Sequence, residues 1–126
     1  MKIIRLNDIT KVPASHEDPA DPGVVKQILL NRDDLAQGRI QMINWSTLLP
    51  GKSFRPHYHE AMDEVFIILD GEVEITIGDE TQRLGQGDVV VVPEHAVHVM
   101  KNLTDGEVHY IAMGIARGTT GKTVVI

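Results

Sequence analysis

Residues 51–71, GKSFRPHYHEAMDEVFIILDG, hold the features from which the fold and the chemistry of this chain can be predicted. His57 and His59 stand one residue apart, and an extended His-x-His segment places both imidazoles on the same face of a strand. Glu64 follows His57 by seven residues and begins an apolar segment that ends at Leu69. Two imidazoles and one carboxylate can therefore converge. Taken alone, the histidines would instead be polar residues at a strand edge.

The apolar segment after Glu64 ends at Asp70-Gly71, which predicts a two-residue hairpin turn. In that hairpin, Ile68 would lie opposite Val73. One face would then carry six residues, of which one is charged: Glu64, Phe66, Ile68, Val73, Ile75 and Ile77. A carboxylate held against a core costs free energy unless a cation or hydrogen-bond donors compensate it. Glu64 therefore either has such a partner or begins its strand at the solvent-exposed rim.

Short strand patterns separated by turn residues continue on both sides of this stretch. The predicted strands are Lys2–Leu6, Val24–Leu30, Arg39–Leu49, Glu64–Leu69, Glu72–Ile77, Thr81–Leu84, Asp88–Val92, Val97–Lys101, Val108–Ile115 and Thr123–Ile126. Three prolines before Val24 predict an extended arm. One helical turn is predicted over Asn31–Gln37, with Asn31 as its cap and Gly38 as its end. No helix of three turns is predicted, so the class is all-β, a sandwich or a barrel.

Length and composition exclude several classes of protein. A chain of 126 residues forms one domain, which we divide into residues 1–23, a strand plus the extended arm, and residues 24–126, the barrel. Without cysteine it has no disulfide, no thiolate-bound metal and no thiol nucleophile. With 12 Lys and Arg against 18 Asp and Glu, we expect no nucleic-acid partner. No apolar run approaches the roughly 20 residues of a membrane helix, so we expect no membrane partner and a cytoplasmic location.

Residues 51–71 resemble the first motif of the cupin family. The matching positions are Gly51, His57, His59, Glu64 and Gly71. Residues 87–102, GDVVVVPEHAVHVMKN, are similar to the second cupin motif. Its matching positions are Gly87, Pro93, His98 and Asn102. His95 is a departure, because family members usually have glycine there. The resemblance implies a one-domain cupin, which is a double-stranded β-helix or jelly-roll barrel.

The resemblance also makes His57, His59, Glu64 and His98 the ligands of a metal. Three imidazoles and one carboxylate suit a divalent ion of manganese, iron, cobalt, nickel, copper or zinc, and they suit calcium poorly. The identity of the metal stays open. Such an ion would neutralise Glu64. Without it, His98 would be a hydrogen-bonded core residue, on the same strand face as Met100 and Asn102.

Two further residues are weaker candidates. Arg55, His57 and His59 stand at alternate positions, so an extended chain would place them on the same face. Arg55 is therefore either a guanidinium that binds an anionic substrate or a solvated arginine at the rim. His95 is either an acid or base catalyst, or a donor to a metal ligand, or a plain histidine on a surface loop. His16 and His109 belong to no pattern, and we expect both to be structural.

Four protein ligands would leave two positions of a six-coordinate ion open to a small-molecule ligand or substrate. The resemblance therefore allows a metal-dependent enzyme, either an oxygenase or a Lewis-acid isomerase or lyase. It equally allows a non-catalytic sensor or storage protein that holds a metal and a metabolite. A metal-free sugar-nucleotide epimerase would leave all four residues unused. The arm and the last strand can add to a neighbour's sheet, and similar small cupins are commonly dimers, so we expect a homodimer.

Overall fold

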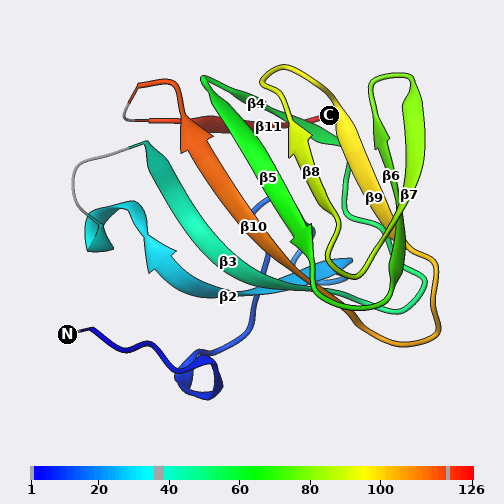
Figure 1. The fold of residues 1–126 in the computed structure, drawn as a ribbon, viewed down its shortest axis with the longest axis horizontal. Coiled ribbons are helices and arrows are strands. Elements are labelled where there is room, and N and C mark those ends of the chain that lie inside the picture. Colours follow the sequence, from blue (N-terminus) through cyan, green and yellow to red (C-terminus); the bar gives the residue numbers. More distant parts are fainter. Residues whose placement is uncertain (1, 36–38, 119) are drawn as a thin grey trace.

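Two antiparallel sheets pack against each other in the computed structural model, which describes residues 2–35, 39–118 and 120–126 (Figure 1). The six-stranded sheet has the order β1-β2-β3-β10-β5-β8, and the five-stranded sheet has the order β11-β4-β9-β6-β7. The strands are β1 (Val12–Pro13), β2 (Val24–Asn31), β3 (Ile40–Leu48), β4 (His57–Glu60), β5 (Met62–Ile68), β6 (Glu72–Ile77), β7 (Glu80–Gly85), β8 (Val89–Val92), β9 (His98–Asn102), β10 (Val108–Ala116) and β11 (Lys122–Val125). The predicted all-β barrel is confirmed.

Alternation of side chains explains how these strands build one core. Along β10, every second residue from Val108 to Ala116 is buried and those between are half-buried. The inward faces of the two sheets meet over large apolar side chains, among them Phe54, Phe66 and Met100. A two-sheet arrangement of this kind buries one face of each strand and leaves the other face to solvent.

The predicted hairpin between residues 64–69 and 72–77 is wrong, although both strands exist. β5 pairs with β10 and β8, whereas β6 pairs with β7 and β9 in the other sheet. Asp70-Gly71 therefore carries the chain from one sheet to the other. Asp70 accepts a hydrogen bond from the backbone N–H of His109 at 2.7 Å, which fixes this crossover against β10. Gly71 has φ +72°, and a Cβ there would lie 2.5 Å from Val108.

The predicted assignment of residues to the inner face is confirmed, although the predicted hairpin is wrong. Five of the six residues assigned to the inner face are buried and Ile77 is half-buried, because alternation fixes the inward face whichever sheet a strand joins. Glu64 is only 5% exposed, so the alternative that it lies at the solvent rim is wrong.

The N-terminal segment differs from the prediction in part. Lys2–Leu6 is not a strand; a single 3-10 turn, η1 (Leu6–Asp8), occupies its end. The Gln27 side chain donates hydrogen bonds to the carbonyls of Leu6 and Ile9, which holds the arm against β2. These side-chain bonds replace the backbone ladder that a strand would need.

The predicted helical turn after β2 is present as η2 (Arg32–Asp34), with Asn31 and Asp34 forming a capping box. Its predicted end at Gln37 and Gly38 lies outside the described residues. In the described ranges, no helix is long and apolar enough to cross a membrane.

Candidate metal site

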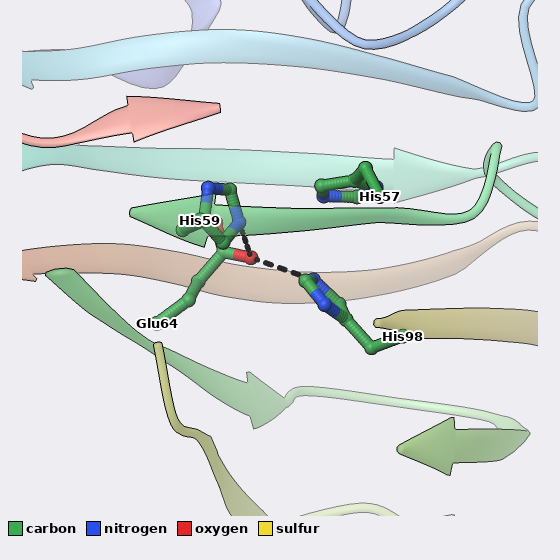
Figure 2. A group of neighbouring side chains, drawn as sticks. All are labelled: His57, His59, Glu64 and His98. Carbon is green, nitrogen blue, oxygen red and sulfur yellow. Dashed lines mark hydrogen bonds and ion pairs between the residues drawn. The ribbon is translucent and has the colours of Figure 1, made fainter. Parts of the chain in front are cut away.

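Four buried side chains from three strands meet between the two sheets (Figure 2). His57 and His59 come from β4, Glu64 from β5, and His98 is the first residue of β9. Each residue offers one ligand atom, and these atoms all lie within 4.8 Å of one another. The structure therefore brings together all four residues that the sequence predicted as metal ligands.

The Glu64 carboxylate is the only acidic group of this cluster. Its Oε1 lies 3.0 Å from His59 Nε2 and 3.3 Å from His98 Nε2, as the dashed lines in Figure 2 show. Burial by itself raises the pKa of Glu64, but the hydrogen bonds from His59 and His98 outweigh it and lower the pKa to about 2. Glu64 is thus an ionised carboxylate at neutral pH.

His57 presents an unpaired nitrogen to the cluster. Its Nδ1 lies 2.7 Å from the Arg55 carbonyl, which can only accept, so Nδ1 carries the proton. Burial, and then the neighbouring His16, lowers the pKa of His57 to about 3, so the ring is neutral and Nε2 holds a lone pair. Nε2 is buried and has no hydrogen-bond partner in the described part of the chain. Since an unpaired buried acceptor is costly, this nitrogen fits a bound cation.

His98 and His59 are held in the same way through Nδ1. His98 Nδ1 lies 3.0 Å from the Ala96 carbonyl, and its Nε2 lies 3.3 Å from Glu64 Oε1. Because a neutral imidazole has a single N–H, His98 can donate to only one of these two acceptors. His59 Nδ1 lies 3.0 Å from the Thr123 hydroxyl, which can donate or accept. Rings held through Nδ1 with Nε2 directed at the cluster are typical of histidines that bind metals. The donor set and its hydrogen bonding therefore fit a divalent transition metal.

His16 belongs to the surroundings of the site, although the sequence showed no pattern around it. Its ring stacks on His57, with centroids 4.1 Å apart and planes 18° apart. Its Nδ1 lies 2.8 Å from Glu17, and the Glu17 carboxylate also accepts the backbone N–H groups of Gly23 and Arg55. Burial lowers the pKa of His16, although Glu17 partly opposes this. A proline-rich arm has no strand periodicity, so only the fold could place His16 here.

The side chains of the two weaker candidates are exposed to solvent. The Arg55 side chain is exposed, and Arg55 serves the site through its backbone. The His95 side chain is 66% exposed, with Nε2 3.6 Å from Glu94. His95 has φ +67°, a left-handed conformation that glycine adopts more easily, so the backbone at this departure from the family keeps the glycine-type conformation. These positions give no support to the substrate role of Arg55 or the catalytic role of His95.

A pocket of about 210 Å³ adjoins the cluster, and neither Arg55 nor His95 lines it. His59 and Glu64 form part of its wall, together with Lys26, Asn44 and Tyr110. Drug-sized ligands occupy pockets of roughly 300–1,000 Å³, so this pocket suits a smaller molecule. A bound small molecule would lie beside His59 and Glu64, two of the four candidate ligands.

A double-stranded β-barrel with three histidines and one glutamate buried between its sheets defines a class of proteins able to hold a metal ion. Residues 44–114 match the sequence model of a family described as a cupin domain, and this match spans more than half of the chain. The chain belongs to the cupin family, as its two motifs predicted.

The relatives carry little functional information. An uncharacterised protein of Streptomyces coelicolor is 30% identical over 105 residues, 83% of this chain and 88% of that protein. An uncharacterised protein of Aquifex aeolicus is 36% identical over 50 residues, 40% of this chain and only 41% of that protein. The crystal structure of a predicted oxalate decarboxylase from Thermotoga maritima has a TM-score of 0.80 at 23% identity, covering 91% of this chain and 99% of that one. That likeness concerns the fold.

Proposed function

We propose that this protein binds one divalent transition metal through His57, His59, Glu64 and His98, and that a small molecule reaches the ion from the adjoining pocket. The observation that carries this proposal is His57 Nε2, which is buried and has no partner in the described residues, in a group of four residues whose ligand atoms all lie within 4.8 Å of one another. The two acceptors around His98, the Ala96 carbonyl and the Glu64 carboxylate, support the proposal. With a bound cation, His98 could donate Nδ1–H to Ala96 while the cation compensates Glu64.

Each protein group has a defined part in this proposal. The carbonyls of Arg55 and Ala96 and the Thr123 hydroxyl orient the three rings, and the ionised Glu64 supplies one negative charge. When bound, a divalent ion supplies Lewis acidity, and a redox-active one also supplies oxygen chemistry. We propose an oxygenase or a Lewis-acid isomerase or lyase on this basis.

A second candidate function is metal and metabolite binding without turnover, as in a sensor or storage protein. The exposed position of His95 favours it, because His95 was the acid or base candidate that the sequence offered and its side chain does not line the pocket. Oxygen uptake and product analysis with a panel of small organic acids separate the two candidates. Turnover that is lost in His98→Ala would identify an enzyme, whereas tight binding without any product would identify a binding protein.

Metal content tests the proposal itself. Protein purified without added metal is analysed by mass spectrometry for the six candidate metals, then stripped with a chelator and titrated with each. We expect one ion per chain in the wild type and loss of that ion in His98→Ala and Glu64→Gln. The matched control is His95→Asn, which removes an exposed histidine but tolerates the left-handed backbone, and it should bind one ion. Wild-type protein that takes up no ion, or a His98→Ala variant that binds as the wild type does, would contradict the proposal.

A further inference from the structure

Lys26 is a cation on the wall of the pocket whose role is unassigned. It lies in β2 and is half-buried. Among the described residues, its ammonium group has no carboxylate within ion-pair distance and no side-chain hydrogen bond. Burial lowers the pKa of Lys26, partly opposed by Glu64, which is the effect of desolvating a charge without a close partner. An anion in the pocket would compensate it.

The sheet places Lys26 in a polar row on the inner face. Lys26 lies opposite Ser46 across β2 and β3, and Ser46 lies opposite Tyr110 across β3 and β10. Burial raises the pKa of the Tyr110 hydroxyl, so this phenol is a neutral group that can donate or accept a hydrogen bond. The row thus offers one cation and two hydroxyls to a ligand.

Asn44 adds a second sign that a polar ligand belongs here. It lies two residues before Ser46 on the same strand face, lines the pocket and is only 5% exposed. Its Oδ1 is buried and, in the described ranges, has no hydrogen-bond partner. Buried polar atoms are seldom left unpaired, so a donor such as a ligand hydroxyl fits this position.

The charges around the pocket favour a ligand with two negative charges. Glu64 is the only acidic residue among those described as lining it. A divalent ion held by Glu64 and three neutral imidazoles carries a net charge of about +1, and Lys26 raises the charge of the groups that line the pocket to about +2. Glu17, which contacts His16, is not one of the lining residues. A dianion would neutralise this charge, with one end at the ion and the other at Lys26.

We propose that Lys26 is a specificity-determining residue, which pairs with an oxyanion of a small dianionic ligand whose other end lies at the metal site. The inference rests on the proposed function, because it needs the ion to hold one end of the ligand. Pocket size limits the ligand to a few carbon atoms. The oxyanion on Lys26 is a carboxylate or a phosphate, since both form strong charge-assisted hydrogen bonds with an ammonium group.

Two matched probe pairs test the role of Lys26 by calorimetric titration of the metal-loaded protein. Malate differs from lactate by one carboxylate, and glycerol 3-phosphate differs from glycerol by one phosphate. We expect the wild type to bind the more highly charged member of at least one pair about tenfold more tightly or better. Lys26→Met and Lys26→Gln should remove that preference, Lys26→Arg should keep most of it, and Lys101→Met, which removes an exposed lysine on β9, should leave it unchanged.

Metal analysis of every variant separates the two levels of the proposal. A wild type that binds no ion contradicts the proposed function. An ion bound equally by the wild type and Lys26→Met, together with an unchanged preference for the charged probe, overturns the role of Lys26 alone. A wild type that binds the ion but prefers neither charged probe overturns it as well. Loss of preference in the malate pair identifies a dicarboxylate, and loss in the glycerol 3-phosphate pair identifies a phosphorylated compound.

Discussion

His16 stacks on His57 with ring planes only 18° apart, so a residue of the N-terminal arm contacts a candidate metal ligand in β4. Glu17, next to His16, holds the arm there by accepting three hydrogen bonds, from Gly23, Arg55 and His16. Arg55 in turn accepts the Nδ1–H of His57. The arm and the first cupin motif are thus joined through one buried carboxylate.

Replacing Glu17 by alanine should therefore destabilise the fold. The change leaves two backbone N–H groups without their acceptor, and each such buried group costs about 1–3 kcal/mol. We expect the free energy of unfolding to fall by about 2–4 kcal/mol in urea titrations. Asp18→Ala is the control, because Asp18 is exposed and caps only the N–H of Ala20. Equal effects of the two substitutions would show that Glu17 does not anchor the arm.

Thr123→Val should weaken metal binding without removing a ligand. Valine has nearly the shape of threonine but cannot hydrogen-bond to His59 Nδ1, which lies 3.0 Å from the Thr123 hydroxyl. Loss of a group that orients a metal-bound histidine lowers affinity roughly 10-fold or more. Competition with a fluorescent chelator measures this change. Thr10→Val, at an exposed position of the arm, should bind the metal as the wild type does.

The stability of the metal-free protein should fall with acidification below about pH 6.5. His57 has a folded-state pKa of about 3 against 6.5 for the free side chain, so the unfolded chain binds a proton that the folded protein excludes. The contribution of the neutral His57 to stability is fully present above about pH 6.5 and is lost as the pH falls towards about 3.

Between about pH 6.5 and pH 5, His57 should account for a loss of about 1–2 kcal/mol in the free energy of unfolding. Urea unfolding of chelator-treated protein at the two pH values measures it. His57→Gln should reduce the pH dependence, and the exposed-site variant His95→Asn should keep it. A pH dependence that is identical in His57→Gln and the wild type would contradict the assignment of a neutral His57.

His95→Gly should stabilise the protein slightly. A left-handed backbone costs a residue with a side chain about 1–2 kcal/mol, part of which is offset by the greater freedom of glycine in the unfolded chain. With φ +67° at His95, we expect a gain of about 0.5–1 kcal/mol and unchanged metal content. Thr81→Gly on β7 is the contrasting variant, because glycine within an ordinary strand should destabilise. Destabilisation by His95→Gly would show that the imidazole itself stabilises the loop.

We predict that the protein is a homodimer. β1 and β11 each lie at an end of their sheet, so in the described chain each has a neighbouring strand on one side only. Free edges of this kind can pair with a second copy. Sedimentation equilibrium at micromolar concentration should give twice the mass of the 126-residue chain, and a monomer mass would contradict the prediction.

Local patterns in the sequence predicted most of the strands, although Lys2–Leu6 is not one, and the resemblance of two motifs to the cupin family implied the four candidate ligands. Alternation assigned Glu64 to the inward face, and His-x-His spacing put His57 and His59 on one side of a strand. These are properties of a single strand, which is why they survived even though the hairpin joining residues 64–69 to 72–77 was wrong. Pairing of β5 with β10 depends on contacts between distant segments, such as that of Asp70 with His109.

The two motifs that resemble the cupin family implied which groups could bind a metal, and side-chain chemistry agreed, because donor atoms and motif spacing are local properties of the sequence. The tertiary structure alone decided what surrounds them. In the folded chain, His16 of the N-terminal arm, which has no strand periodicity, stacks on His57. Lys26 and Asn44, from two neighbouring strands, line the same pocket as Glu64. The tertiary structure also left His95 and the Arg55 side chain in solvent. Burial and long-range contact depend on how the sheets pack, and short-range sequence patterns do not specify that packing.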